Sequence, residues 1–278
     1  MYEKIVVPLD GSSLAEVALP YAEEIAAKAS SKLTLLSVLQ TEEDEEYQRH
    51  HRYATKMVET TRHQIEKYLE KPRGEGIKVE GATRIGNPAK GILEYVSKGS
   101  PSLIVMATHG RSGVSRWAVG SVADNVVRGT SRQPVLLIRA RGAYPDVRAK
   151  RILKRALVPL DGSIRSEAVI SSIMWLAYSL NMEITFLQVA PTTNHIPVNT
   201  EAYLQSKCRM FEDKGISATY YIRIGAAADE IIDLADEITS DVVAMSTHGQ
   251  TTLSLWPLGS VAQKVLLGGN TPLMLTRA

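Results

Sequence analysis

Residues 4–20 read KIVVPLDGSSLAEVALP, and residues 155–171 read RALVPLDGSIRSEAVIS. The two stretches align without a gap and place Asp10 opposite Asp161, an offset of 151 residues. Each opens with a short apolar run, turns at Pro-Leu-Asp-Gly-Ser and continues into a segment with apolar residues at helical spacing. A unit of this kind that occurs twice indicates a tandem duplication of one α/β domain.

The repeat continues through both halves of the chain. Val38 corresponds to Val189 at the same offset, whereas RIGNPAKGILEYV from Arg84 returns as RIGAAADEIIDLA from Arg223 at an offset of 139. The second copy is therefore 12 residues shorter in this interval, because the offset falls from 151 to 139. The loss falls in the long polar stretch of the first copy, where a surface helix tolerates trimming better than a core strand does.

Within the first copy, apolar runs alternate with amphipathic or charged stretches. The runs predict strands at Ile5–Pro8, Leu33–Leu39, Ile77–Ile85, Leu103–Ala107 and Pro134–Ile138. The stretches between them predict helices near Leu14–Ile25 with a capping box of Ser13 and Glu16, over Glu42–Lys71, over Ala89–Lys98 and after Gly120.

Strands that are apolar almost throughout, each followed by a helix, are typical of a parallel sheet covered on both faces. The sequence therefore predicts two tandem doubly wound α/β domains, each with a five-stranded parallel sheet and helices on both faces. We expect the first domain over residues 1–140, a polar linker over 141–152 and the second domain over 153–278.

Composition excludes several classes of protein. The 278 residues are 44% hydrophobic and 22% charged, with a formal net charge of +2, which is an ordinary globular balance. Such a small charge gives no reason to expect nucleic acid or a membrane as a partner. The single Cys208 excludes an internal disulfide, the N-terminus lacks the apolar core of a signal peptide, and no apolar run approaches the ~18 residues that span a bilayer. We expect a cytoplasmic protein.

In a doubly wound sheet, ligands bind beyond the carboxyl ends of the strands, where the strand order reverses. The turn after the first strand, the end of the second strand and the segment after the fourth strand are expected to meet there. In the first copy these pieces are Pro8-Leu9-Asp10-Gly11, Val38 and Met106-Ala107-Thr108-His109-Gly110. In the second copy they are Pro159-Leu160-Asp161-Gly162, Val189 and Met245-Ser246-Thr247-His248-Gly249.

The chemistry of these pieces suits a nucleotide. The carboxylate of Asp10 can accept a hydrogen bond from a ribose hydroxyl or a base amine, and a slot between apolar side chains can hold a flat base. The segment after the fourth strand leads to Gly120-Ser121, which lies ten residues beyond Gly110 and opens a helix. Glycine lets backbone N–H groups approach a ligand closely, and the free N–H groups at a helix N-terminus favour phosphate.

The motif is not one of the common phosphate-binding sequences. Gly86-Asn-Pro-Ala-Lys-Gly91 has the glycine spacing of a Walker A motif, but Ile92-Leu93 stand where that motif requires Lys-Ser/Thr. The chain instead resembles the universal stress protein family (UspA-like), whose ATP-binding members carry Gly-x-x-Gly, nine residues, then Gly-Ser/Thr. Here Ala107-Thr-His-Gly110 precedes Gly120-Ser121, and Ser246-Thr-His-Gly249 precedes Gly259-Ser260, each across nine residues. Three of the four motif positions match in each copy, and the resemblance covers both copies almost end to end.

The resemblance implies an adenine nucleotide alpha hydrolase-like fold and a regulatory or stress-response protein that binds ATP or a related adenine nucleotide, with Mg²⁺ as a candidate companion. It implies no fast turnover, so we do not expect an enzyme. The first-copy residues expected to hold the nucleotide are Pro8, Leu9, Asp10, Val38, Met106, Ala107, His109, Gly110, Arg111, Gly113, Gly120, Ser121 and Val122. Their expected counterparts in the second copy are Pro159, Asp161, Val189, Met245, Ser246, Gly249, Gly259, Ser260 and Val261.

The two copies are not expected to bind nucleotide equally well. The first motif glycine is Ala107 in one copy and Ser246 in the other, and alanine leaves more room for a phosphate. Arg111 and Arg116 are available to a triphosphate in the first loop, whereas the second loop has no basic residue. Pro257 also removes a backbone donor from the second loop. The first domain is therefore the better candidate.

Several of these residues have a purely structural alternative. Ser121-Val-Ala-Asp124 and Ser260-Val-Ala-Gln263 both match a capping box, and Asp10-Gly11 matches a simple turn before a helix. His109 and His248 lack the neighbours of a metal site or a catalytic nucleophile, which favours a hydrogen-bonding anchor. Cys208, between Lys207 and Arg209, is either a thiol of lowered pKa or a thiol packed on a helix.

Two other functions remain open. One is a scaffold or interaction protein without nucleotide, because Ala107 and Ser246 move the chain toward family members that lack the glycine motif. The other is a slow ATPase or self-phosphorylating protein, although the sequence offers no clear base for an attacking water. We also expect the last strands, Val135–Ile138 and Leu273–Leu275, to pair within the chain as a pseudo-dimer, with a homodimer as a further option.

Overall fold

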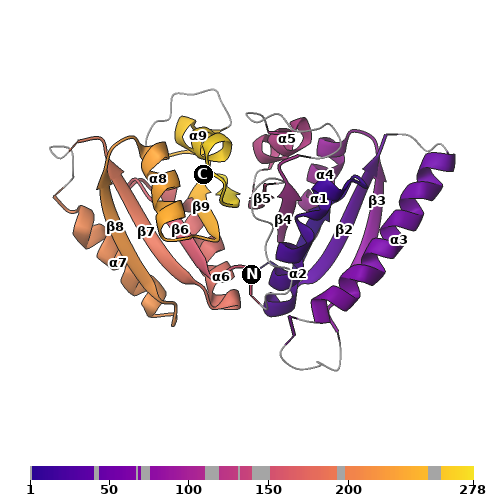
Figure 1. Ribbon diagram of the computed structural model, residues 1–278, viewed down its shortest axis with the longest axis horizontal. Coiled ribbons are helices and arrows are strands. Elements are labelled where there is room, and N and C mark those ends of the chain that lie inside the picture. Colours follow the sequence, from indigo (N-terminus) through magenta and orange to yellow (C-terminus); the bar gives the residue numbers. More distant parts are fainter. Residues whose placement is uncertain are drawn as a thin grey trace. The chain divides into compact units, whose positions relative to one another are not determined.

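The chain forms two compact units, Met1–Ile152 and Leu153–Ala278, which repeat the same order of elements (Figure 1). The computed structural model describes residues 2–40, 44–66, 68–69, 76–109, 119–130, 132–139, 151–192, 198–249 and 258–278. Within these ranges no helix is both long and apolar enough to cross a membrane.

The first unit alternates strands and helices as the hydrophobic pattern predicts. Its elements are β1 Lys4–Pro8, α1 Ser13–Glu16, α2 Leu19–Ala29, β2 Lys32–Leu39, α3 Asp44–Glu66, β3 Val79–Ile85, α4 Pro88–Ser97, β4 Ser102–Ala107, α5 Ser121–Gly129 and β5 Val135–Ile138. The strands pair in parallel in the order β3-β2-β1-β4-β5. The order therefore reverses between β1 and β4.

The second unit has the same topology. Its elements are β6 Arg155–Pro159, the 3₁₀ helix η1 Ser166–Val169, α6 Ile170–Leu180, β7 Glu183–Ala190, α7 Thr200–Glu212, β8 Ala218–Ile224, α8 Ala227–Glu237, β9 Val242–Ser246, α9 Ser260–Gly268 and β10 Leu273–Thr276. The parallel order is β8-β7-β6-β9-β10, with the reversal between β6 and β9.

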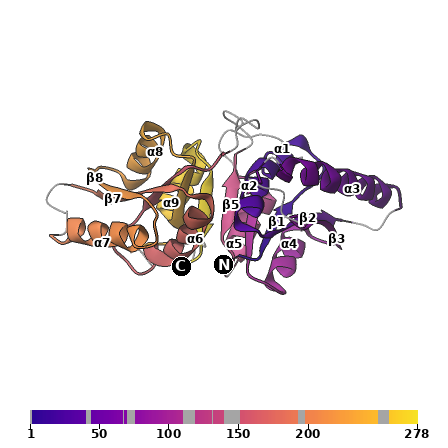
Figure 2. The same ribbon diagram turned by 90° about the horizontal axis from the view of Figure 1, so that it is seen from below.

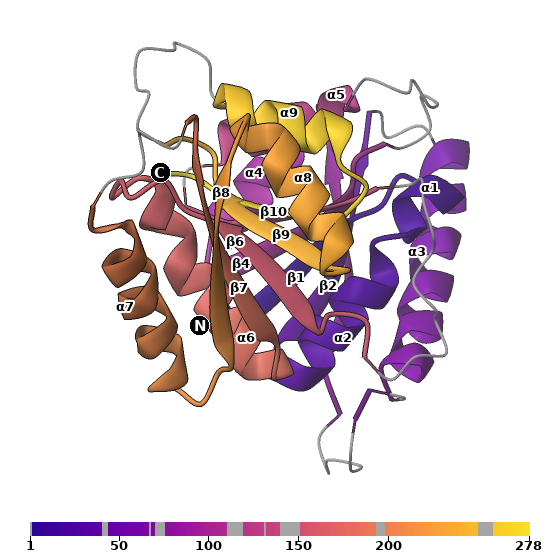
Figure 3. The ribbon, with the colours of Figure 1, turned by 60° about the vertical axis from the view of Figure 1, so that its left-hand side comes forward.

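Helices cover both faces of each sheet. In the first unit α2 and α3 pack on one face, and α4 and α5 pack on the other (Figure 2). In the second unit α6 and α7 lie on one side of the strands, and α8 and α9 lie on the other (Figure 3). The predicted fold class, two doubly wound α/β domains with five parallel strands each, is confirmed.

Burial explains why the central strands read as continuous apolar runs. Every residue of β4 and β5 is buried, whereas the edge strand β3 is buried only at Val79 among its seven residues. A strand that helices cover on both faces of the sheet has no position for a solvated side chain. The same reasoning applies in the second unit to β9 and β10, which are also fully buried.

The start of the first helical region differs from the prediction. A single helix over Leu14–Ile25 is wrong, because α1 ends at Glu16 and α2 begins at Leu19 with Pro20 in its first turn. The capping box of Ser13 and Glu16 is also wrong. The N-cap is Ser12, whose Oγ accepts from the Ala15 N–H at 3.3 Å. Glu16 instead accepts a hydrogen bond from the Tyr53 hydroxyl at 2.9 Å.

Candidate functional site

A cavity of about 430 Å³ lies beyond the carboxyl ends of β1, β2 and β4, where the strand order of the first unit reverses. This is the place at which doubly wound sheets bind ligands. Its volume falls within the ~300–1,000 Å³ typical of small-molecule sites. The lining residues are Pro8, Leu9, Asp10, Ala15, Leu36, Val38, Leu39, Gln40, His50, Pro88, Ile92, Met106, Ala107, Thr108, His109, Gly120, Ser121, Val122 and Ala123.

The structure brings the first-copy site residues together. Those that it describes all line the cavity, namely Pro8, Leu9, Asp10, Val38, Met106, Ala107, His109, Gly120, Ser121 and Val122. Gly110, Arg111 and Gly113, together with Arg116, lie outside the described residues. Ligand binding by these residues stays a prediction.

The turn after β1 fixes the position of Asp10 at the cavity. Its Oδ1 atom accepts from both the N–H and the hydroxyl of Ser12, at 3.0 and 2.6 Å. Gly11 has a φ of 82°, a conformation that glycine adopts without strain. One carboxylate oxygen of Asp10 therefore shapes the turn. The second copy repeats the arrangement, since Asp161 Oδ1 accepts from the N–H and hydroxyl of Ser163 at 3.0 and 2.6 Å.

Helix α5 presents an uncapped N-terminus to the cavity. Its N-cap is Gly120, so no side chain caps it, and the hydroxyl of Ser121 makes no hydrogen bond within the described part of the chain. The first N–H of the helix that finds a carbonyl acceptor is that of Asp124, which donates to the Gly120 carbonyl at 3.0 Å. The N–H groups of Ser121, Val122 and Ala123 come before it, and all three residues line the cavity. Donors in this arrangement, at the positive end of the helix dipole, favour an anion.

The capping-box alternative for the two serines is wrong. Ser121 and Ser260 occupy the first helical position, one residue after the glycine N-caps Gly120 and Gly259. Asp124, the expected partner of Ser121, instead forms an ion pair with Arg128 at 2.6 Å. The serine hydroxyls therefore have no capping role.

The contrast with α4 shows what an ordinary helix start looks like in this fold. The side chain of Asn87 caps α4 by accepting from the Lys90 N–H at 3.1 Å. Pro88 removes a further donor from the first turn of that helix. The segment from Gly86 to Gly91, which has Walker-like glycine spacing, therefore contains a helix start that its own side chain caps. It does not leave the N–H groups of that helix free in the way that α5 does.

The fold itself requires glycine at the start of α5. The Gly120 N–H donates to the Thr108 carbonyl at 2.8 Å, and a Cβ on Gly120 would lie 3.0 Å from that same oxygen. In the second unit, a Cβ on Gly259 would lie 2.9 Å from the Thr247 carbonyl oxygen. Close backbone approach thus explains both glycines, whether or not a ligand is present.

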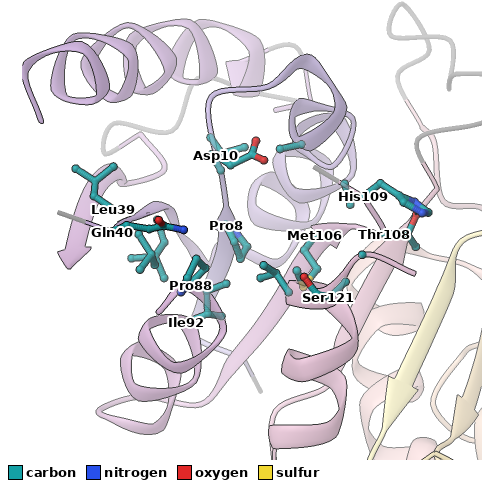
Figure 4. A pocket seen from close by; sticks show the side chains of 18 of the residues that line it. Pro8, Asp10, Leu39, Gln40, Pro88, Ile92, Met106, Thr108, His109 and Ser121 are labelled. Atoms are coloured by element: carbon teal, nitrogen blue, oxygen red, sulfur yellow. The ribbon is translucent and has the colours of Figure 1, made fainter. Parts of the chain in front are cut away.

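The opposite end of the cavity is mainly apolar and includes residues that the sequence did not indicate. Figure 4 shows Leu39, Gln40, Pro88 and Ile92 on the side away from Ser121. Pro88 and Ile92 come from the first turns of α4, which starts three residues after β3 ends. The rule that carboxyl ends of parallel strands meet at one edge could have indicated Pro88. His50 and Gln40 carry no such signal.

His109 is held by its neighbour in the sequence. The His109 Nδ1 atom lies 3.0 Å from the Thr108 hydroxyl, and the corresponding distance between His248 and Thr247 is 3.1 Å. Thr108 and Thr247 are both buried. Across the described ranges, no group of three or more His, Cys, Asp or Glu side chains is arranged to hold a metal ion. The geometry favours the hydrogen-bonding anchor.

The second copy places its site residues at the equivalent edge of its own sheet. Pro159 ends β6, Val189 lies on β7, and Met245 and Ser246 end β9. Asp161 and Gly249 follow β6 and β9, and Gly259, Ser260 and Val261 start α9. Pro257 lies outside the described residues.

Two polar side chains, those of Asp161 and Ser246, lie at this edge of the second sheet. A Cβ on Gly249 would collide with Asp161 Oδ2, so the carboxylate lies directly against the second glycine of the motif. The hydroxyl of Ser246, which replaces the first motif glycine, is buried and accepts from the His248 N–H at 3.4 Å. Side-chain atoms of this copy therefore fill space next to the loop glycine.

Cys208 is a buried thiol on α7, with 7% of its surface exposed. Burial raises the pKa of the Cys208 thiol above its usual value, and the nearby Glu212 carboxylate raises it further. The alternative of a thiol with lowered pKa is therefore wrong, even though Lys207 and Arg209 flank it in the sequence. Lys207 is engaged elsewhere, in an ion pair with Glu167 at 2.8 Å.

The model of the universal stress protein family matches residues 1–139 and 153–277, which are almost the whole of each unit. The chain belongs to the universal stress protein family. It carries the universal stress protein domain twice, which confirms the predicted tandem organisation.

Individual universal stress proteins resemble either one half or the whole of the chain. The universal stress protein MJ0577 of Methanocaldococcus jannaschii is 24% identical over 162 residues, 51% of this chain and 98% of that protein. The crystal structure of a universal stress protein from Archaeoglobus fulgidus covers 99% of this chain and 96% of its own, with a TM-score of 0.71 and 19% identity, so the two share the fold. A universal stress protein solved in complex with cAMP covers 45% of this chain and 97% of its own, with a TM-score of 0.39 and 21% identity. That similarity is too low to assign its ligand to this chain.

Proposed function

We propose that the first domain binds ATP or a related adenine nucleotide and that the protein acts as a cytoplasmic regulator in the stress response, without fast turnover. The base lies at the apolar end of the cavity, against Val38, Ile92 and Met106. The phosphates lie at the N-terminus of α5, and Asp10 faces the ribose between them. This arrangement follows the two chemically different ends of the cavity.

The observation that carries the proposal is the open N-terminus of α5. Ser121, Val122 and Ala123 line the cavity, and their three consecutive N–H groups have no acceptor among the described residues. The far end of the same cavity is mainly apolar. Three N–H donors without a protein acceptor at a helix N-terminus, two of them on the buried Ala123 and the half-buried Val122, suit an anionic group. An adenine nucleotide supplies both a flat apolar base and such a group.

We further propose that the second domain binds nucleotide more weakly or not at all. The hydroxyl of Ser246 lies where a phosphate would approach the motif loop. In the first domain the residue at the Ser246 position is Ala107, which has no polar side chain.

Calorimetry of ATP binding to Ser121→Ala and its matched control Ser260→Ala tests both proposals. Neither hydroxyl caps its helix, so neither change is expected to alter folding. A hydrogen bond to a charged group contributes about 1.5–3 kcal/mol, so Ser121→Ala is expected to weaken ATP about 10- to 150-fold. Ser260→Ala is expected to bind as the wild type does.

The titration is run with and without Mg²⁺, and both variants are first shown to melt with the wild-type protein. Wild-type protein that gives no binding heat with ATP, ADP or AMP would overturn the nucleotide proposal. Equal weakening in both variants, with two nucleotides per chain, would overturn the preference for the first domain alone.

One observation favours a second function, a scaffold that binds partners without nucleotide. The close approach of Gly120 and Gly259 to threonine carbonyls accounts for the motif glycines through the backbone alone. The glycine spacing could therefore persist in a protein that has lost its ligand. Purified protein that releases no nucleotide on denaturation, and whose melting temperature ATP does not change, would support this function.

A further inference from the structure

A second, smaller cavity lies on the α4 side of the first unit, apart from the nucleotide cavity. It has a volume of about 160 Å³, and its lining residues are Lys4, Arg84, Glu94, Tyr95 and Lys98. None of these residues lines the larger cavity. Three of the five are cations and one is a carboxylate, so the cavity has an excess of positive charge.

Two of the three cations lie near the same aromatic ring. Lys4 Nζ lies 4.5 Å from the centroid of the Tyr95 ring, and Arg84 Cζ lies 5.1 Å from it. In the part of the chain that the structure describes, Lys4, Arg84 and Lys98 form no ion pair. Lys4 and Arg84 each lie within the distance at which the Tyr95 ring attracts a cation.

The carboxylates nearby are already engaged. Glu94 pairs with Lys90 on the same helix at 3.8 Å. Glu80 pairs with Lys32 at 2.5 Å and approaches Lys78 at 4.0 Å. Burial lowers the pKa of Lys4, and Lys32 lowers it further against an opposing effect of Glu80. Lys4 is thus held in surroundings that disfavour its positive charge, which an anion would relieve.

The second unit shows an anionic group at the same place in the fold. There Arg223, which corresponds to Arg84, is paired with Glu237 and lies 3.6 Å from Glu230. At the offset of 139, the residues at these two positions in the first unit are Lys98 and Gly91. One copy of the repeat therefore neutralises its arginine with carboxylates of α8, and the other copy presents the arginine with a further cation.

We propose that Lys4, Arg84 and Lys98 form an oxyanion site that binds a phosphate group in the cavity beside Tyr95. The guanidinium offers two parallel N–H donors to a phosphate, and the two ammonium groups add charge. The phosphate is either the free ion or the phosphoryl group of a larger molecule, and the same three side chains bind both. The site is independent of the nucleotide proposed for the larger cavity.

Nuclear magnetic resonance titration of the ¹⁵N-labelled full chain tests the site. Inorganic phosphate and phosphoserine are the two probes, and chloride at matched ionic strength is the control. We expect saturable shifts centred on Lys4, Val79–Ile85 and residues 88–98 with phosphate and not with chloride. Saturation by both probes assigns a phosphoryl group as ligand, and saturation by inorganic phosphate alone assigns the free ion.

Two variants locate the binding. Lys98→Glu introduces the carboxylate that the second unit has at this position, and it is expected to pair with Arg84, preserve the fold and weaken phosphate at least tenfold, which is about 1.4 kcal/mol. Arg84→Gln is expected to weaken phosphate to a similar degree. Lys264→Gln removes an exposed cation from α9 in the second unit and is expected to change nothing.

The proposal is overturned if the shifts do not saturate, if chloride reproduces them, or if Lys98→Glu and Arg84→Gln both bind phosphate as the wild type does. Phosphate that enters the larger cavity would shift the amides of Ser121 and Val122, a separate set of signals that neither variant should affect. The two sites are therefore distinguished within one titration.

Discussion

Replacing Gly120 with alanine should destabilise the first unit even when no nucleotide is present. Gly120 has φ −57° and ψ 143°, a conformation that alanine also adopts, so the backbone angles carry no penalty. The penalty comes from the added Cβ, which would lie 3.0 Å from the Thr108 carbonyl oxygen. That oxygen cannot retreat freely, because it accepts the Gly120 N–H at 2.8 Å.

Overpacking of this kind costs about 1–3 kcal/mol. For a domain of this size, each kcal/mol lowers the melting temperature by about 4 °C, so Gly120→Ala should lower the melting of its unit by about 4–12 °C. Gly259→Ala should cost as much in the second unit, since its Cβ would lie 2.9 Å from the Thr247 carbonyl oxygen.

Differential scanning calorimetry of nucleotide-free protein measures the effect, with Gly76→Ala as the matched control. A Cβ on Gly76 meets nothing within 4 Å, so this variant should melt with the wild type. If Gly120→Ala and Gly259→Ala also melt with the wild type, backbone packing does not explain the motif glycines. Their requirement would then have to come from a ligand.

Further predictions concern three other residues of the chain. Cys208 should react with iodoacetamide at pH 8 more slowly than free cysteine and rapidly once the protein is unfolded, because its pKa is raised in the folded state. The same shift makes the stability of the second unit depend on pH. The contribution of the neutral Cys208 thiol is fully present below the unfolded pKa of about 8.5 and is lost as the pH rises through the folded pKa. Comparing the alkaline unfolding of Cys208→Ala with that of the wild type measures this contribution. Phe186→Ala should destabilise the second unit by about 3–5 kcal/mol in urea unfolding, since Phe186 is fully buried and packs edge-on at 5.2 Å against Phe211. Glu24→Ala should destabilise the first unit by about 1–3 kcal/mol in the same assay, because the buried carboxylate accepts the Ile152 N–H with both oxygens at 3.0 Å, and wild-type stability would contradict this role.

The strands and the edge at which the site forms could be read from the sequence. The β4 strand begins at Ser102 and ends at Ala107, one residue from the predicted start and at the predicted end. Continuous apolar runs identify buried parallel strands, and the order reversal of a doubly wound sheet then places Asp10, Val38 and Met106 at one cavity.

The helix starts could not be read in the same way. The serine of Gly120-Ser121 matches a capping box locally, but the structure puts glycine at the cap because the chain passes against the Thr108 carbonyl, a contact between residues 12 apart. Likewise, Ser12 and Ser13 are equivalent by composition, and only the turn built on Asp10 selects Ser12. Capping is decided by tertiary contacts that a local pattern does not contain.

The contributions of His50 and Ile92 to the cavity were also beyond the sequence. Both residues sit on helices whose amphipathic pattern indicates which face is buried, but not which part of that face overlies a strand end. Side chains that line a cavity between layers depend on how each helix is placed along its strands, and that placement follows from packing across the whole unit.

Hydrogen exchange at the start of α5, with and without saturating ATP, tests most directly whether the first domain binds nucleotide through this helix. The amides of Ser121, Val122 and Ala123 have no acceptor among the described residues, so phosphate at this position should slow their exchange. The equivalent amides of α9, from Ser260 to Ala262, should exchange at the same rate in both conditions. Unchanged exchange at α5, or protection at α9 in its place, would contradict the account.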